Sequence, residues 1–367
     1  MRAVGIIFSN VHDNSVPELS RIRTLGSIPF GGRYRLIDFP LSNMVNSGID
    51  TVGIITKSNY QSLMDHVGSG KDWDLARKDG GLIILPPYGD ENSSKLYDSR
   101  LEALKGITSF LFRADEDYVV MTDCDAICRV NYNDVIEKHI MNKADITLVY
   151  TKMNSVEKAT LLNIEPDGRI TAAYYKENVE DENSNVFTNI FVMKLSLLQN
   201  IVMDSITHNK THFTKDVISP NLESMRIMGY EHKGFYAGIT SLQAYYDSSL
   251  KMLDANVRHE IFGDRSVFTK IRDSAPARYG NSAIVKNSLI ADGCDIQGEV
   301  ENSIIFRNVK VGRGAVIKNS IVMQNTVLGE NCSLNCIIAD KNVTITDRKV
   351  LSGSENHPFY LGKGTMV

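Results

Sequence analysis

Two acidic residues, Asp123 and Asp125, follow an apolar run at residues 118–121 that has the length and composition of a strand. Side chains two positions apart on an extended chain point to the same side, so these carboxylates could share one divalent cation. Acidic pairs at strand ends are also common as solvated side chains that bind nothing. The pattern therefore marks a candidate metal site and leaves the solvated alternative open.

The segments that must position this pair alternate between strand and helix over residues 1–255. Runs rich in β-branched residues, such as 4–8, 52–56 and 146–150, have strand length, and stretches of helical period lie between several of them. This alternation predicts an α/β domain whose mostly parallel sheet is covered by helices. Ligands bind such sheets beyond the carboxyl ends of the strands, so the chemistry is expected in the loops that follow strands.

A different pattern occupies residues 282–346. Apolar residues recur there every six positions, with glycines and asparagines between them; one such series is Val309, Ala315, Ile321 and Val327, continued by Ser333. This period is typical of a parallel β-helix, whereas a β-sandwich would need alternation at every second residue and longer strands. We predict a β-helix with a C-terminal tail over 282–367, joined to the first domain by a linker at 256–281.

The composition restricts the class of protein. Of 367 residues, 43% are hydrophobic and 23% charged, which is ordinary for a globular protein. The formal net charge of −4 argues against a nucleic-acid-binding protein, and no apolar run is long enough to span a membrane. Five cysteines are too few, and odd in number, for a disulfide framework, and the N-terminus lacks the features of a signal peptide. We therefore expect a cytoplasmic protein.

A family resemblance is carried by three strings: Pro29-Phe30-Gly31-Gly32-Arg33-Tyr34-Arg35, Gly68-Ser69-Gly70-Lys71 and Arg77-Lys78-Asp79-Gly80-Gly81. They resemble signatures of the glucose-1-phosphate adenylyltransferases (ADP-glucose pyrophosphorylases), whose C-terminal hexapeptide domain is similar to the period-six segment. The resemblance implies a Rossmann-like nucleotidyltransferase domain, a left-handed β-helix and a tetramer. It also implies the Mg²⁺-dependent reaction of ATP with glucose 1-phosphate, which gives ADP-glucose and pyrophosphate and feeds glycogen synthesis.

The chain departs from the family pattern in the loop that holds the triphosphate. The family's Gly-Gly-x-Gly-x-Arg falls on residues 10–15, and the degenerate positions are Asn10, Val11, Asp13 and Ser15. Glycine serves this loop because positive φ lets backbone N–H groups approach phosphates, and a residue such as Val11 would cost about 1–2 kcal/mol in that conformation. Asp13 adds a negative charge beside a polyanion, and Ser15 stands in place of the arginine.

The implied metal ligands are half retained. Asp125 matches the family's first aspartate, Gly238 stands where the second is expected, and Asp123 could compensate. We expect the isolated chain not to retain Mg²⁺. The Asp-x-Asp pattern also resembles the metal motif of nucleotide-sugar glycosyltransferases, which keeps that class open.

The sugar-phosphate positions implied by the resemblance are partly kept. Lys176 retains the ammonium expected to meet the phosphate of glucose 1-phosphate, although it is equally a candidate surface lysine. Tyr175 replaces an acid expected near the sugar hydroxyls, and Asn189 stands where the family has a glycine. The segment that lines the nucleotide sugar falls on residues 99–102.

Two arginines, Arg23 and Arg35, match positions that bind anionic effectors in relatives. Two guanidinium groups can converge on a small anion because each offers a fork of donors. The alternative is that either arginine caps a helix or pairs with a nearby carboxylate.

These losses fall on the chemistry and spare the packing motifs, as in the GlgD-type regulatory subunit of bacterial adenylyltransferases. We predict a subunit with little or no activity alone, which modulates a catalytic paralogue in a heterotetramer and binds small anionic effectors or sugar phosphates. One alternative is a self-sufficient adenylyltransferase that uses Asp123 and Asp125. Another is a glycosyltransferase or a sugar-phosphate sensor.

Overall fold

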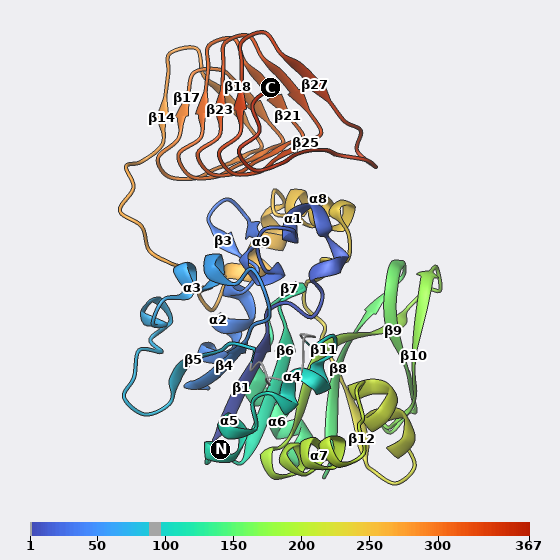
Figure 1. The fold of residues 1–367 in the computed structure, drawn as a ribbon. Coiled ribbons are helices and arrows are strands. Elements are labelled where there is room, and N and C mark those ends of the chain that lie inside the picture. Colours follow the sequence, from blue (N-terminus) through green and yellow to red (C-terminus); the bar gives the residue numbers. More distant parts are fainter. Residues whose placement is uncertain (1, 88–96) are drawn as a thin grey trace. The chain divides into compact units, whose positions relative to one another are not determined.

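The computed structural model describes residues 2–87 and 97–367 (Figure 1). The chain forms two compact units, one of Met1–His12 and Phe39–Tyr236 and the other of Asp13–Asp38 and Ala237–Val367. The predicted domain limits at residues 255 and 282 stay a prediction. The predicted linker at 256–281 contains most of helix α9 (Ala255–Phe262) and the first strand of the β-helix, β14 (Arg278–Tyr279).

The first unit is built on a nine-stranded sheet with the order β10-β9-β11-β6-β1-β4-β5, in which β8 pairs with β11 and β12. Its strands are β1 (Ala3–Phe8), β4 (Thr51–Ile55), β5 (Gly81–Leu85), β6 (Tyr118–Asp123), β8 (Ile146–Met153), β9 (Val156–Ile164), β10 (Ile170–Val179), β11 (Ser184–Lys194) and β12 (Ile227–Glu231). The central strands β6, β1, β4 and β5 are parallel, while β9, β10 and β11 run antiparallel to their neighbours. The predicted α/β domain is confirmed.

Helices cover both faces of this sheet because successive strand residues point to opposite sides. The helices are α2 (Asp38–Asn46), α3 (Gln61–Val67), α4 (Arg100–Lys105), α5 (Thr108–Arg113), α6 (Tyr132–Met141) and α7 (Leu195–Thr207). Val4 and Ile6 of β1 share a buried cluster with apolar residues of α4, α5 and α7. Gly5 faces the other way, where an added Cβ would lie 2.9 Å from the sulfur of Met44 on α2. The fully apolar β1 therefore fits a strand buried on both faces.

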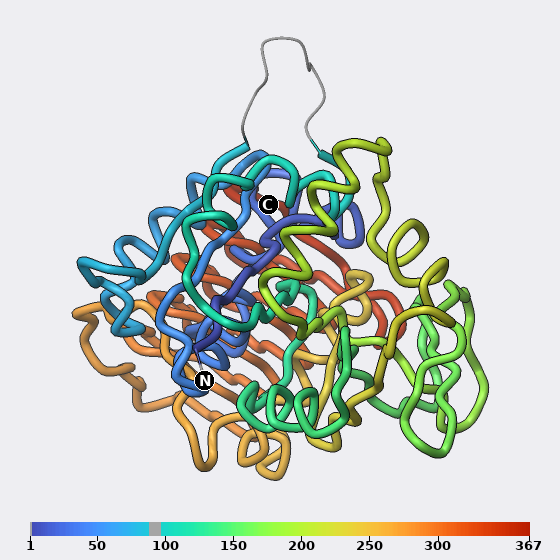
Figure 2. The backbone as a smooth tube through the Cα atoms, turned by 90° about the horizontal axis from the view of Figure 1, so that it is seen from below, coloured from blue at the N-terminus to red at the C-terminus, as the bar shows by residue number. Residues whose placement is uncertain are grey.

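The second unit contains fifteen short strands in three parallel sheets, drawn in orange to red in Figures 1 and 2. One sheet has β14, β17 (Asp295–Ile296), β20 (Lys310–Val311), β23 (Val327–Leu328) and β26 (Thr344–Ile345). The second has β15 (Ile284–Lys286), β18 (Glu299–Glu301), β21 (Val316–Lys318), β24 (Ser333–Asn335) and β27 (Val350–Ser352). The third has β16 (Leu289–Ile290), β19 (Ile304–Ile305), β22 (Ile321–Val322), β25 (Ile337–Ala339) and β28 (Phe359–Leu361). These sheets are the architecture of the predicted left-handed β-helix.

The β-helix interior follows the predicted six-residue period only locally. Val309 and Ala315 of the series lie in the interior cluster, whereas Val327 is exposed, because successive coils pair at an offset of 17 residues, as Val311 does with Leu328. Val311, Ile317, Leu328 and Leu334 are buried inside the coils, together with the cysteines Cys294 and Cys332. Asparagines turn the corners with positive φ, and their side-chain amides bond from coil to coil at 3.3 Å (Asn308 to Asn325) and 3.1 Å (Asn325 to Asn342). Asparagine tolerates this conformation better than other non-glycine residues.

Residues 13–38 and two helices pack on the β-helix within the second unit. The segment contains α1 (Pro17–Ser20), β2 (Pro29–Phe30) and β3 (Tyr34–Arg35), and the helices are α8 (Leu242–Lys251) and α9. The buried Tyr245 of α8 donates to the Pro29 carbonyl at 2.6 Å, and Tyr246 donates to the Asn319 carbonyl at 2.5 Å. This tyrosine pair therefore joins α8 to its neighbours within the second unit.

Candidate functional site

The two acids lie at the carboxyl end of β6, beside the end of β1. Asp123 is the last residue of β6 and stands in register with Phe8, the last residue of β1. Asp125 follows in the turn before β7 (Ala126–Cys128). Because β1 and β6 are parallel, the loop after β1 lies at the same edge of the sheet as the two carboxylates. Ligand sites form at this edge in such sheets.

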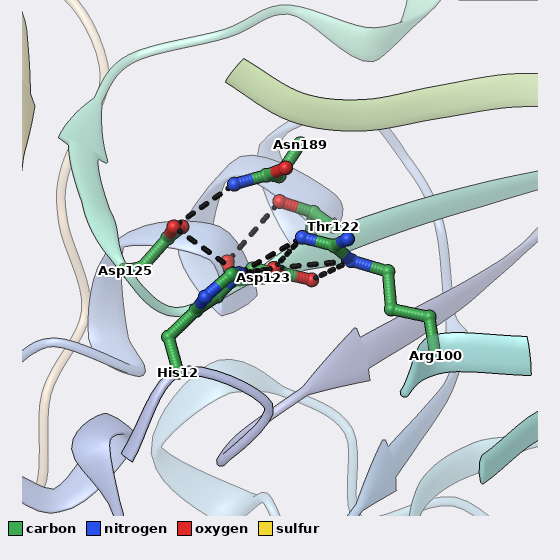
Figure 3. A network of polar contacts seen from close by, with 6 residues as sticks. All are labelled: His12, Arg100, Thr122, Asp123, Asp125 and Asn189. Atoms are coloured by element: carbon green, nitrogen blue, oxygen red, sulfur yellow. Dashed lines mark hydrogen bonds and ion pairs between the residues drawn. The ribbon is translucent and has the colours of Figure 1, made fainter. Parts of the chain in front are cut away.

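Arg100 binds Asp123 through two of its nitrogens (Figure 3). It is the first residue of α4, whose N-cap Ser99 accepts a hydrogen bond from the Glu102 N–H at 3.2 Å. The Arg100 Nε donates to Asp123 Oδ1 at 2.9 Å and contacts Oδ2 at 3.1 Å, and Nη2 donates to Oδ2. The Asp123 side chain is 1% exposed and that of Arg100 is 14% exposed. This is a buried, two-point ion pair, the strongest geometry for guanidinium and carboxylate.

His12 and Asn189 complete the network. The His12 Nε2 lies 2.7 Å from Asp123 Oδ2 and 3.6 Å from Asp125 Oδ2. Asn189 lies in an irregularity of β11 with φ of 61° and donates its side-chain N–H to Asp125 Oδ2 at 2.9 Å. The position that the family gives to glycine thus keeps a left-handed backbone and gains a side-chain donor.

Charges move the pKa values of the network in different directions. Burial raises the pKa of Asp123, but the Arg100 charge and the His12 hydrogen bond outweigh burial and hold it below the ordinary value. Burial is also the largest effect on Asp125, whose pKa is raised, with the Asp123 charge adding to the rise. Burial lowers the pKa of His12, but Asp125 and the hydrogen bond to Asp123 prevail and raise it. Both cationic groups therefore stabilise an ionised Asp123.

The network does not fit a divalent ion as it stands. Ligand atoms of His12, Asp123 and Asp125 lie within 4.8 Å of one another, which is close enough for a metal site. Both oxygens of Asp123 and one of Asp125 already accept hydrogen bonds, so only the buried Asp125 Oδ1 has no partner within the described residues. Mg²⁺ demands about six oxygen ligands in octahedral geometry. Gly238, at the end of β13 (Tyr236–Gly238), supplies no carboxylate.

Side chains of the degenerate loop after β1 form hydrogen bonds with other residues of the chain. Asn10 is buried and accepts from the Tyr97 hydroxyl at 2.9 Å, and Asp13 Oδ1 accepts from the Leu25 N–H at 2.7 Å. Asp13 and Ser15 form a short 3₁₀ turn. Among residues 2–30 none has positive φ. The backbone therefore does not form the concave nest of N–H groups that glycines give a phosphate loop.

A cavity of about 450 Å³ lies in the first unit beside Arg100. Cationic and hydroxyl groups on its wall include Arg100, His212, Thr214 and Lys215, and apolar or aromatic groups include Val11, Tyr174 and Tyr175. Lys176 is not among its lining residues, and its ammonium instead lies 2.6 Å from Asp181 in a surface ion pair. The assignment of Lys176 to substrate binding stays a prediction.

The second unit gathers cations around one buried carboxylate. Arg23, 3% exposed, places Nη2 2.5 Å from Asp340 Oδ2, while its buried Nη1 has no hydrogen-bond partner within the described residues. The Tyr360 hydroxyl donates to the same Asp340 oxygen at 3.0 Å. Burial, then the charges of Arg35 and Arg23, and further that of Lys363, lower the pKa of Lys341 to about 7. The charges of Arg35, Arg23 and Lys363 thus all act on Lys341 beside this carboxylate.

The two-residue spacing at the strand end predicted Asp123 and Asp125 but not the residues that neutralise them. The sequence did contain a hint for Arg100, because this cationic residue lies in the segment 99–102 that aligns with the family's nucleotide-sugar lining. Lys215 and Lys341 carried no signal in their local sequence. Asp340 lies 317 positions from Arg23, so only the fold joins these two residues.

The fold and the site define a nucleotidyltransferase-type chain with a hexapeptide domain, and comparisons with known proteins agree. Residues 17–255 match the nucleotidyl transferase family, and residues 274–357 match the GlmU-like C-terminal hexapeptide family. The chain is 32% identical to the glycogen biosynthesis protein GlgD of Bacillus subtilis, over 98% of this chain and 96% of that protein. It is 34% identical to GlgD of Geobacillus stearothermophilus, over 100% and 97%.

A similar but shorter match is the glucose-1-phosphate adenylyltransferase of Clostridium perfringens, 30% identical over 88% of this chain and 84% of that enzyme. The chain belongs to the family of GlgD proteins and glucose-1-phosphate adenylyltransferases, within the nucleotidyl transferases. Within the described ranges, no helix combines the length and apolar character needed to cross a bilayer.

Proposed function

We propose that this chain is a regulatory subunit of glucose-1-phosphate adenylyltransferase in glycogen biosynthesis, with little or no activity alone. The observation that carries this proposal is the loop after β1, where none of residues 2–30 has positive φ. ATP therefore lacks the nest of backbone N–H groups that would hold its phosphates. The proposed partner is a catalytic paralogue in a cytoplasmic heterotetramer, and the full-length similarity to GlgD proteins supports this assignment.

The state of the two acids supports low activity. Displacement at the α-phosphorus of ATP needs charge stabilisation, and a metal ion commonly supplies several kcal/mol of it. Asp123 is bound by Arg100 and His12, so it is not available as a ligand in this arrangement. Each ~1.4 kcal/mol of lost stabilisation lowers the rate about tenfold. These observations speak against a self-sufficient adenylyltransferase that uses Asp123 and Asp125.

The cationic cluster supports an effector site for a small anion. Arg23 and Arg35 were predicted for this role, and Lys341 and Lys363 add positive charge within the same unit. Arg23 also pairs with Asp340, as the alternative interpretation anticipated, but its Nη1 remains without a partner among the described residues. An anion could accept from that nitrogen beside the neighbouring cations.

The test compares three samples: the chain alone, its genomically adjacent adenylyltransferase alone, and both co-expressed. Sizing is expected to show a mixed oligomer, and pyrophosphate release by the chain alone is expected to be at least about a thousandfold below that of the partner, which is ~4 kcal/mol. The mixture is expected to differ from the partner in turnover or in its response to anions. Pyrophosphate release by the chain alone at an ordinary enzymatic rate would overturn the proposal.

A second candidate role, a sugar-phosphate sensor, is favoured by the cavity beside Arg100. Lys215 offers an ammonium and His212 an imidazole N–H for a phosphate, and Tyr174 and Tyr175 offer aromatic surface for a sugar or base. Calorimetry with glucose 1-phosphate, ADP-glucose and UDP-glucose tests this role. Saturable binding of a sugar phosphate without turnover supports the sensor, and heat of dilution alone excludes it.

A further inference from the structure

Three segments that depart from the family pattern converge on the same two carboxylates. His12 comes from the loop after β1, Arg100 from the start of α4 and Asn189 from the irregular part of β11 (Figure 3). In sequence these positions are far apart, yet each places a nitrogen within hydrogen-bond distance of Asp123 or Asp125. Side chains from these three segments are therefore parts of one network.

Charge balance explains why such a network forms. Asp123 and Asp125 are 4% and 7% exposed as whole residues, and two buried carboxylates this close repel each other unless a cation compensates them. A divalent ion is one way to supply the compensation. Here the Arg100 guanidinium, with His12 beside it, contributes the positive charge from within the chain.

The guanidinium is fixed in place from more than one side. It holds Asp123 through Nε and Nη2, and its Cζ lies 5.8 Å from the centroid of the Phe191 ring. Phe191 is buried in β11, and the Arg100 backbone begins a capped helix. A cation that entered would have to displace this side chain from a buried partner. The buried Asp125 Oδ1 has no hydrogen-bond partner among the described residues, so it is the carboxylate oxygen that a metal ion could bind.

We propose that Arg100 is an internal counter-cation that occupies the place of a divalent metal and excludes it, and that removing its charge opens a metal site made of His12, Asp123 and Asp125. One imidazole nitrogen and carboxylate oxygens suit Mn²⁺ or Zn²⁺ better than Mg²⁺. The proposal concerns cation binding and not turnover, so it does not rest on the regulatory role proposed above.

The experiment measures Mn²⁺ binding to the full chain by electron paramagnetic resonance of the free ion. Wild type and Arg100→Lys are expected to show no saturable binding, because both keep a cation beside Asp123. Arg100→Gln is expected to bind one Mn²⁺ saturably, at least about tenfold more tightly than the weakest binding that the measurement detects, which is ~1.4 kcal/mol. Adding Asp125→Asn or His12→Ala to Arg100→Gln is expected to remove that binding.

The Tm of the same variants, measured with and without Mn²⁺, is a second test of metal binding. Mn²⁺ is expected to raise the Tm of Arg100→Gln and to leave that of wild type unchanged, since a ligand stabilises the state that binds it. Equal Mn²⁺ binding by wild type and Arg100→Gln would overturn the proposal, as would a folded Arg100→Gln that binds none. If Arg100→Gln does not fold, the measurement is made on wild type. Mn²⁺ binding by wild type that is lost in Asp125→Asn would contradict the exclusion of metal by Arg100. A wild type that binds no Mn²⁺ supports it.

Discussion

The carboxylate network of the first unit and the cationic cluster of the second both bury charge, but they balance it differently. Asp123 and Asp125 meet Arg100 and His12, so two acids face two cationic groups. In the other cluster, Asp340 pairs with Arg23, and the charges of Arg35, Arg23 and Lys363 lower the pKa of Lys341. In the first arrangement Arg100 holds its carboxylate from two nitrogens, whereas in the second the buried Arg23 Nη1 has no hydrogen-bond partner among the described residues and could donate to an anion.

The largest expected effect comes from breaking the complete network. Arg100→Gln leaves Asp123 buried beside a single cationic group, and removing one partner of a buried ion pair typically lowers the free energy of unfolding by about 3–5 kcal/mol. Urea unfolding measures the change. The matched control is Arg113→Gln, an exposed arginine whose Nε donates to the Ser109 carbonyl, with an expected change within about 0.5 kcal/mol. Equal small changes in both variants would show that the network carries no stability.

A smaller loss is expected when the carboxylate of the cationic cluster is neutralised. Asp340→Asn removes the charge but keeps an amide oxygen that can accept from Arg23 or Tyr360, so the expected loss in the free energy of unfolding is about 1.5–3 kcal/mol in total. Because a negative charge is lost beside the cations, sulfate is expected to bind more tightly and to recover part of the lost Tm. Sulfate is not expected to rescue Arg100→Gln. A rescue of both variants would contradict the distinction between the clusters.

Next in size is the effect of the arginines on regulation. In the mixed oligomer with the catalytic partner, Arg35→Ala or Arg23→Ala is expected to raise the anion concentration for half-maximal response about tenfold, since one charge-assisted contact is lost. Arg33→Ala is the control, because Arg33 is exposed and its guanidinium lies over the Tyr34 ring. Steady-state assays over a range of anion concentrations give the result, and unchanged curves for Arg35→Ala would count against the site.

The smallest effect expected is a pH dependence of anion binding. The pKa of Lys341 is lowered to about 7 by burial and by Arg35, Arg23 and Lys363, with Asp340 opposing them. Lys341 is therefore protonated below pH 7, and sulfate affinity is expected to fall by up to about tenfold per pH unit above that value. Calorimetry between pH 6 and 8 (roughly one unit either side of this pKa) measures it, with Lys341→Gln expected to give a flat profile.

The lowered pKa of Lys341 also determines whether the free energy of unfolding rises or falls with pH. Unfolded Lys341 stays protonated well above pH 7, so the unfolded state binds more protons than the folded state in this range. The contribution of Lys341 to the free energy of unfolding is therefore expected to increase as pH rises above 7 in the absence of anions. Chemical denaturation with Lys341→Gln as reference measures it. A decrease relative to that variant would show that Lys341 is not the titrating group.

Local patterns made the fold predictable, while the charge network depended on long-range contacts. The six-residue period predicted the β-helix and placed Val309 and Ala315 inside it, but the 17-residue offset between coils leaves Val327 of the same series exposed. The Asp123 and Asp125 pair followed from strand spacing. Arg100 lies 23 positions before Asp123, and only the placement of α4 over the end of β6 brings the two together. Family resemblance showed which positions had changed but not that their new side chains meet.

That meeting of side chains has a consequence for how the sequence can evolve. Restoring glycines at residues 10–15 alone would not free Asp123 from Arg100, and replacing Arg100 alone would leave two acids facing each other. Returning Asn189 to glycine removes the donor that Asp125 uses. Each of these single changes is therefore expected to be neutral or harmful by itself, so the family-type residues fit these positions only in combination.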